Sequence, residues 1–239
     1  MNVTLISWTR QPVETIHAMA QNMQGNIITD LEEVTGRNEA IETVMELEKT
    51  NIGGPLEAVD FIFQVEGVPR ALTHQMVRTR IGAMYSQESL RFVAKEGEQF
   101  KYDIGPSINE DDHRLMVYMS AMREIQTAYE KLIKAGASTQ DARGILPINI
   151  MTNIGVKYNL KTLMGVAEVR LCTQSQEHWQ SVIRQMKQEI YSKVHPVLSG
   201  LLKPYCERHG KCGFKSIFDR PCPRREQIES GSNDQEVER

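Results

Sequence analysis

The sequence predicts an α+β fold, in which a small, mostly antiparallel sheet packs with several helices. Between Val59 and Val65, apolar residues alternate with polar ones, as expected for a strand with one buried face. In several longer stretches, apolar residues instead recur every three or four positions, which is the spacing of an amphipathic helix. Helix is therefore expected to exceed strand.

The expected elements follow in chain order. Strands are expected over residues 3–7 and 59–65. Pro12 suits the first turn of a helix, because its fixed φ is helical and its missing N–H costs nothing there. Helices are expected over residues 12–23, 37–50, 69–78, 111–135, 139–147, 160–172 and 177–202.

Glycine and proline set several of the expected boundaries. Gly67 and Pro69 are expected to break the second strand and to start the short helix that follows it. Gly82 is expected to end that helix, and residues 86–93 are expected to form a loop or a short extended segment. Residues 96–110 are polar and without a clear period, which predicts a surface loop.

The longest expected helix has an apolar stripe that should face the core. Methionines at this spacing favour packing over contact with a cofactor. The stripe consists of Leu115, Met119, Met122, Ile125, Tyr129 and Leu132.

Length and charge favour small-molecule chemistry. The chain has 239 residues, with 28 Lys and Arg against 31 Asp and Glu, so its net charge of -3 disfavours nucleic acid or an anionic membrane as a partner. No apolar run could span a bilayer, and the first residues lack the features of a signal peptide, so a cytoplasmic location is expected.

The composition also divides the chain. A main domain is expected over residues 1–202, followed by a basic extension with Cys and His over residues 203–225. Residues 226–239 are polar and almost free of apolar side chains, which predicts a disordered tail.

One stretch, residues 71–93, is dense in groups that can bind a phosphate. Arginine forks and serine hydroxyls suit phosphate oxygens, so a nucleotide site is one interpretation and a solvated basic face is the other. The residues concerned are Gln75, Arg78, Arg80, Ser86, Gln87, Glu88, Ser89 and Arg91.

Common catalytic motifs are missing from the sequence. It contains no Gly-rich phosphate loop, no GxGxxG, no HExxH and no GxSxG, and its six histidines are scattered. No cysteine lies near residues 71–93, which argues against a thiolate nucleophile there. If the chain is an enzyme, its chemistry is expected to come from a cofactor.

Five segments, in this order, resemble the signature of the flavin-dependent thymidylate synthases. Together with Arg170 and Trp179, they extend the resemblance over residues 3–202. The segments are Pro55-Leu-Glu57, Gln75-x-x-Arg78-Thr-Arg80, Tyr85-Ser-Gln-Glu-Ser89-x-Arg91-Phe92, Ala142-Arg143-Gly-Ile-Leu-Pro147 and Asn159-Leu-Lys161-Thr-Leu-Met164.

The resemblance implies the family's fold and its reaction, the reductive methylation of dUMP to dTMP. It implies a homotetramer in which FAD and a pyrimidine nucleoside monophosphate bind at active sites shared between subunits. NADPH would reduce the flavin, methylenetetrahydrofolate would supply the one-carbon unit, and no cysteine nucleophile would be needed.

The resemblance also implies roles for individual residues. Arg170 would contact the pyrimidine and stabilise negative charge on the ring during catalysis. The substrate would be bound by Gln75, Arg78, Ser89, Arg91, Arg143 and Arg170. The flavin would be bound by Glu57, Arg78, Thr79, Arg80, Gln87, Asn159 and Lys161.

Three family histidines are replaced here, by Ile52, Ala58 and Thr79. A divergent enzyme that keeps the activity is one explanation. Another is a changed reaction, with dCMP or UMP as the substrate or with a hydroxymethyl product. A non-catalytic nucleotide-binding homologue is a third explanation, which the retention of both Arg143 and Arg170 disfavours.

The C-terminal extension holds a possible metal-binding set. Cys206, His209, Cys212 and Cys222 are residue types that bind Zn²⁺ tetrahedrally. A reduced extension without metal is the alternative, and a small nucleic-acid-binding knuckle is a third interpretation.

Overall fold

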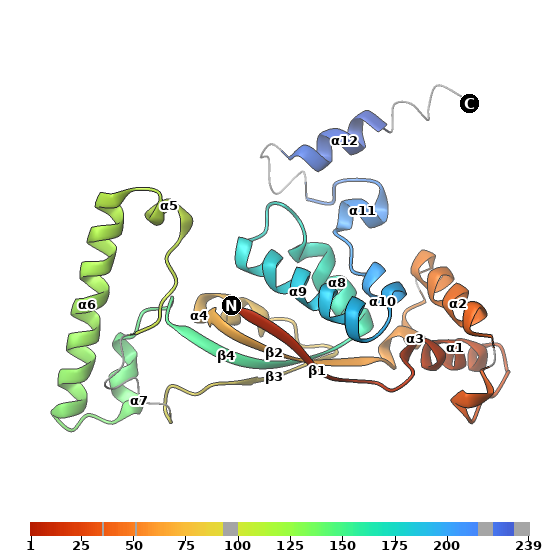
Figure 1. Ribbon diagram of the computed structural model, residues 1–239, viewed down its shortest axis with the longest axis horizontal. Coiled ribbons are helices and arrows are strands. Elements are labelled where there is room, and N and C mark those ends of the chain that lie inside the picture. Colours follow the sequence, from red (N-terminus) through yellow and green to blue (C-terminus); the bar gives the residue numbers. More distant parts are fainter. Residues whose placement is uncertain (35, 51, 93–99, 215–221, 232–239) are drawn as a thin grey trace. The chain divides into compact units, whose positions relative to one another are not determined.

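The structure is a computed structural model that describes residues 1–34, 36–50, 52–92, 100–214 and 222–231. Within these ranges, four strands form one antiparallel sheet with the order β1-β2-β4-β3 (Figure 1). The strands are β1 (Asn2–Trp8), β2 (Asp60–Pro69), β3 (Ala83–Gln87) and β4 (Met151–Asn159). The predicted α+β class is confirmed.

Helices make up most of the remaining described chain. In order, these are α1 (Pro12–Met23), α2 (Arg37–Lys49), α3 (Gly54–Glu57), α4 (Arg70–Met76), α5 (Pro106–Asn109), α6 (Asp112–Lys134), α7 (Thr139–Ala142), α8 (Leu160–Arg170), α9 (Glu177–Lys193), α10 (Pro196–Gly200), α11 (Tyr205–His209) and α12 (Pro223–Gly231), with 3-10 turns η1 (Leu31–Glu33) and η2 (Arg143–Ile145). No helix within the described ranges combines the length and the apolar character that a bilayer crossing requires.

Two predictions about strands were wrong. β2 continues through Gly67 to Pro69, because Gly67 adopts φ 62° and its N–H donates to the Asn153 side chain at 3.0 Å. β4 was not predicted at all, although its buried residues Thr152, Ile154, Val156 and Tyr158 alternate with more exposed ones.

Three other boundaries also differ from the prediction. The expected helix over residues 177–202 is divided into α9 and α10, since His195 takes an extended conformation and caps α10 through the N–H of Val197. The expected loop over residues 96–110 contains α5, while its residues 96–99 lie outside the described ranges. Residues 226–231, which were expected to be disordered or loosely attached, belong to α12, and residues 232–239 lie outside the described ranges.

The chain forms two compact units, and it passes between them within β2, β3 and β4. The first unit contains Met1 and residues 65–78 and 85–155, and the second contains residues 2–64, 79–84 and 156–239. Each unit is described by itself below.

The first unit has a small core under α6. Phe100 and Tyr129 meet edge to face, with ring centroids 5.5 Å apart, and Ala142 of α7 completes the cluster. The apolar stripe predicted for this helix is only partly buried, because Met119 and Leu132 are 36% and 38% exposed.

The second unit is built around α9. This helix packs beside β1, α8 and α10 (Figure 1) and buries Trp179 and Ile183. The Leu5 N–H donates to the Glu189 carboxylate at 2.6 Å, which joins the strand to the helix. This core supports α8, which carries the predicted site residues Lys161 and Arg170.

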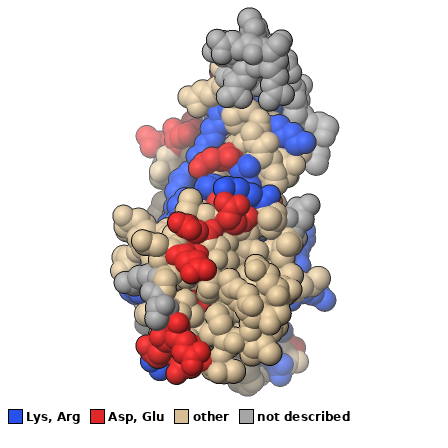
Figure 2. Space-filling view, turned by 90° about the vertical axis from the view of Figure 1, so that its right-hand side faces the viewer, with Lys and Arg blue, Asp and Glu red and all other residues tan. Residues whose placement is uncertain are grey.

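The basic extension is attached to the second unit by ion pairs. Lys203 lies 3.0 Å from Glu48, and the Arg208 guanidinium lies 2.8 Å from the Glu168 carboxylate. On the face of the molecule that Figure 2 draws, Lys and Arg side chains lie next to Asp and Glu side chains.

Candidate functional site

The predicted site residues fall into two groups, one in each unit. The first unit contains Gln75, Arg78, Gln87, Ser89, Arg91 and Arg143. The second contains Glu57, Thr79, Arg80, Asn159, Lys161 and Arg170. Most of the residues predicted to bind the nucleotide thus belong to the first unit, and most of those predicted to bind the flavin belong to the second.

In the first unit, the end of β3 is attached to α4. The Gln87 amide donates to the Thr73 hydroxyl at 2.8 Å, and that hydroxyl donates to the Arg70 carbonyl at 3.1 Å. Because Thr73 is fully buried, these bonds are protected from water and fix the Gln87 side chain. Gln87 therefore has a structural role in addition to its predicted contact with flavin.

The turn after β3 presents Ser89 and Arg91. Its start is held by Glu88, whose carboxylate accepts hydrogen bonds of 3.2 Å from the backbone and the side chain of Asn153. The Ser89 hydroxyl accepts from the Arg91 N–H at 3.3 Å, and the Arg91 carbonyl accepts from the Thr139 hydroxyl at 2.5 Å. This last bond links the turn to α7, the helix that precedes Arg143.

A pocket of about 300 Å³ in this unit is lined by two arginines and a histidine. Arg70 and His74 come from α4 and Arg143 comes from η2, while Leu90 and Pro147 contribute apolar surface. Burial and the nearby positive charge of Arg143 lower the pKa of Arg70, which Glu88 opposes only in part. Two guanidinium groups this close favour an anion between them.

The sequence prediction named one of these three side chains. Arg143, a predicted substrate ligand, lines the pocket, whereas Gln75, Arg78, Ser89 and Arg91 are not among the lining residues. Arg70 and His74 were missed, although their separation of four residues places them on one face of a helix.

In the second unit, the loop before β3 is fitted closely against the start of α8. Gly82 has φ 67°, and a Cβ atom there would collide with the Thr162 hydroxyl oxygen. The same hydroxyl donates to the Ile81 carbonyl at 3.0 Å, and the Asn159 side chain caps α8 by accepting from the Thr162 N–H at 2.8 Å. These contacts place the neighbouring Thr79 and Arg80 close to a helix N-terminus.

Lys161 adds a positive charge to the first turn of α8. Its side chain runs along Gly53, where a Cβ atom would meet the Lys161 Cε at 2.8 Å. Glu57 ends the short helix α3, which packs against α8, and its side chain is exposed. A lysine at a helix N-terminus is suited to an anionic group such as a diphosphate.

Arg170 is held by an aromatic ring in the second unit. Its guanidinium carbon lies 4.8 Å from the ring centroid of Trp179, which is itself buried. Arg170, Gln174, Ser175 and Phe214 are among the residues that line a cavity of about 140 Å³. The guanidinium is therefore oriented by Trp179, and Arg170 forms part of the wall of this cavity.

The predicted zinc ligands are not assembled as expected. Within the described residues, no group of three or more His, Cys, Asp or Glu side chains is arranged to hold a metal ion. The His209 Nε2 atom instead lies 3.4 Å from the Glu168 carboxylate, and its ring packs at a tilt on Tyr205, with ring centroids 4.2 Å apart. The contacts with Glu168 and Tyr205 engage the one histidine of the predicted set.

Two of the extension's thiols have shifted pKa values. Burial raises the pKa of Cys206, an effect that Arg224 opposes and Cys172 reinforces. A hydrogen bond with the Thr173 hydroxyl, 3.2 Å away, lowers the pKa of Cys222.

The fold and the arginine-lined pocket define an α+β protein suited to binding a phosphorylated small molecule. Residues 4–197 match the family model described as thymidylate synthase complementing protein, so the chain belongs to this family. The family resemblance predicted from the sequence is thereby confirmed.

Several relatives bear the name flavin-dependent thymidylate synthase. That of Pyrococcus furiosus is 30% identical over 228 residues, which cover 93% of each chain. That of Clostridium tetani is 37% identical over 177 residues, covering 66% of this chain and 68% of the relative. That of Sulfurisphaera tokodaii is 31% identical over 210 residues, covering 87% and 80%.

Proposed function

We propose that this protein is a flavin-dependent thymidylate synthase, which converts dUMP to dTMP by reductive methylation. The match to the Pyrococcus relative over 93% of both chains carries this proposal. The names of the relatives favour dUMP over the alternatives of dCMP, UMP or a hydroxymethyl product.

In this proposal, the pocket of the first unit binds the nucleotide phosphate. Arg143 and Arg70 would each donate charge-assisted hydrogen bonds to its oxygens, and the anion would relieve the repulsion between the two guanidinium groups. Gln75, Arg78, Ser89 and Arg91 stay as predicted ligands for the rest of the nucleotide.

The residues around the start of α8 fit the anionic part of FAD. The Gly82 loop lies against the N-terminus of α8, and Lys161 adds a positive charge there. When bound, the flavin supplies the hydride for the reaction. The proposed ligands are Glu57, Arg78, Thr79, Arg80, Gln87, Asn159 and Lys161.

Arg170 is proposed as the catalytic residue that contacts the pyrimidine. Its guanidinium would donate to a ring carbonyl and stabilise the negative charge that develops there. The Trp179 ring limits the positions open to that guanidinium, so little reorganisation is needed during the reaction. NADPH and methylenetetrahydrofolate are the proposed co-substrates.

A homotetramer with shared active sites is proposed as the working assembly. The exposed apolar side chains of α6 support a contact between subunits, since Met116 is 66% and Val117 58% exposed. Burying such a surface against another copy would stabilise the assembly.

The test is an assay of the purified protein with FAD, NADPH, methylenetetrahydrofolate and one nucleotide at a time. We expect dUMP to gain the mass of one methyl group, measured by mass spectrometry of the product. Parallel reactions contain dCMP or UMP. A gain on one of these without a gain on dUMP would contradict the proposed substrate, and no gain on any nucleotide would contradict the activity.

A further inference from the structure

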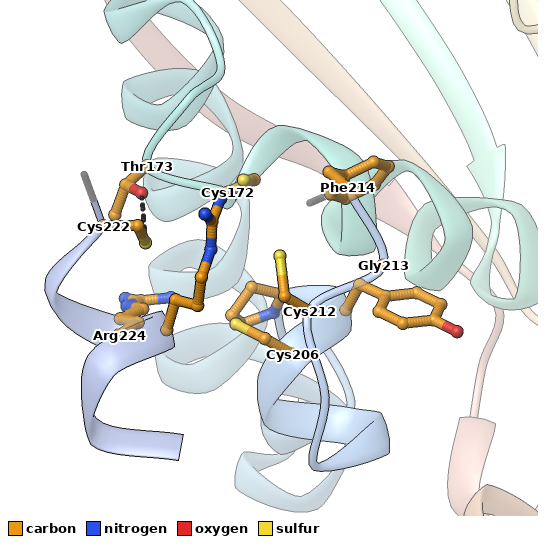
Figure 3. A pocket seen from close by; sticks show the side chains of 11 residues that line it. Cys172, Thr173, Cys206, Cys212, Gly213, Phe214, Cys222 and Arg224 are labelled. Carbon is orange, nitrogen blue, oxygen red and sulfur yellow. Dashed lines mark hydrogen bonds between the residues drawn. The ribbon is translucent and has the colours of Figure 1, made fainter. Parts of the chain in front are cut away.

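All four cysteines of the chain line a single cavity, which Figure 3 shows from close by. They come from three separate segments: Cys172 follows α8, Cys206 and Cys212 lie on and after α11, and Cys222 precedes α12. Each is partly buried, and none is in a disulfide. The fold thus gathers every thiol of the protein in one place.

The cavity is the size of an ion. Its volume of about 20 Å³ has room for about one water-sized particle, far too little for a nucleotide or a peptide side chain. Apart from the thiols, Pro204, Tyr205 and Phe214 contribute mainly apolar surface. An occupant must therefore be small. The polar groups that line the cavity are the four thiols, Thr173 and two arginines, Arg224 and Arg225.

The positive charges at this cavity also point to an anionic cluster. Arg224 lines the cavity beside the cysteines. Its Nη1 atom is buried and has no hydrogen-bond partner among the described residues. Neutral thiols are weak acceptors for such a donor, whereas a divalent ion held by four thiolates carries a net charge of −2 and accepts charge-assisted bonds through sulfur.

We propose that Cys172, Cys206, Cys212 and Cys222 bind one Zn²⁺ ion as four thiolates. Each thiol would release its proton to solvent and donate a sulfur lone pair to the metal. Cys172 takes the place of His209, which is engaged by Glu168 and Tyr205.

The thiols line the cavity without already forming a coordination sphere. Binding requires them to turn inward about χ1, and Cys222 must exchange its bond to Thr173 for the metal. Metal binding commonly supplies the free energy for such local ordering.

The zinc site would affect the cavity beside Arg170. Cys172 and Phe214 line both the thiol cavity and the Arg170 cavity. A metal bound to Cys172 and Cys212 would hold Phe214 of the extension against the segment after α8. The proposed ion therefore has a structural role at the edge of the Arg170 cavity and takes no part in a chemical step.

The test measures metal content in the full-length protein after expression with added zinc and dialysis. We expect about one zinc per chain, measured by mass spectrometry of the metal. C172S should lose most of the metal, and the matched control H209A should retain it. Less than about one zinc per two chains in the parent protein would overturn the proposal. Retention by C172S together with loss by H209A would also overturn it.

X-ray absorption on the zinc of the unaltered protein gives a second readout, which does not depend on how the variants fold. Four sulfur ligands at about 2.3 Å are expected, while a nitrogen in the first shell would contradict the assignment. Intact-mass analysis under denaturing, non-reducing conditions should find four reduced thiols. A disulfide between any two of them would overturn the site.

Discussion

The two candidate binding regions are built in different ways. The pocket of the first unit depends on charge, because Arg70 and Arg143 come from elements far apart in the sequence and repel one another until an anion arrives. The region around Gly82 in the second unit depends on shape, because the loop and the start of α8 fit with no space for a side chain. Removing a charge from the pocket should therefore weaken ligand binding with little effect on folding stability. Disturbing the close fit around Gly82 should reduce both ligand binding and folding stability.

The largest effect is expected from G82A. The new methyl group would collide with the Thr162 hydroxyl and force a left-handed conformation on alanine, so the free energy of unfolding should fall by about 3 kcal/mol. Denaturant unfolding measures this change, and absorbance of the bound flavin measures FAD content, which should fall with it.

The matched control for that variant is G165A on α8. A Cβ atom at Gly165 meets nothing within 4 Å, and alanine is the better helix former, so stability should rise by about 0.5 to 1 kcal/mol. Equal stability of G82A and the parent protein would show that the loop is not closely fitted.

R143A should weaken dUMP binding by about 30-fold, or about 2 kcal/mol, because a charged donor to the phosphate is removed. Calorimetric titration with dUMP measures the Kd, and FAD content should not change. The control is R123A, which removes an exposed arginine of α6 in the same unit. An unchanged Kd in R143A would exclude this pocket as the phosphate site.

N159A separates a structural from a ligand-binding role. Loss of the α8 cap should lower the free energy of unfolding by about 1 kcal/mol, and N159D should restore it, since aspartate also caps a helix. If the Asn159 amide also contacts the flavin, N159D should regain stability without regaining FAD affinity. Recovery of both properties in N159D would assign Asn159 a purely structural role.

The smallest effect is expected from E189Q, and it should depend on pH. Burial raises the pKa of Glu189, but bonds from Lys193 and the Leu5 N–H outweigh this, so the net pKa is lowered in the folded protein. A pKa that is lower in the folded than in the unfolded state stabilises the protein at pH values above the ordinary glutamate pKa. This contribution disappears as the pH falls through the pKa of the folded state.

Near neutral pH, E189Q should therefore be less stable by about 0.5 kcal/mol, and the difference should shrink in acid. Urea unfolding at several pH values measures it. The exposed pair of Glu46 and Lys49 gives the control E46Q, which should change stability little at any pH. A difference for E189Q that grows in acid would contradict the lowered pKa.

Local sequence patterns predicted much of the fold. Pro12 opens α1, the alternation after Val59 forms β2, and the helix expected over residues 111–135 corresponds to α6. The extent of β2 was missed because a glycine with positive φ can remain in a strand when a side chain from the neighbouring strand, here Asn153, accepts its N–H. The β propensity of the residues around Gly67 gives no information about a hydrogen-bond acceptor on another strand.

The candidate site was predicted less completely. Arg143 was identified from the family resemblance and lines the charged pocket, but Arg70 and His74 were not identified. Nothing local distinguishes an arginine at the start of α4 from a solvated one, since its proximity to Arg143 depends on how distant segments pack. The thiol cavity also depends on how distant segments pack, because Cys172 lies 34 residues before Cys206 in the chain.

The sequence by itself determined the family, the α+β class and the residue types available for a nucleotide and a flavin, because motifs and periodicity are local properties of the chain. Only the tertiary structure decided that Arg70 joins Arg143 and that Cys172 joins the three cysteines of the extension. The physical reason is that both features depend on distances in space. Guanidinium groups repel one another and thiols share a cavity only when packing brings them together, and the spacing of residues along the sequence does not determine that packing.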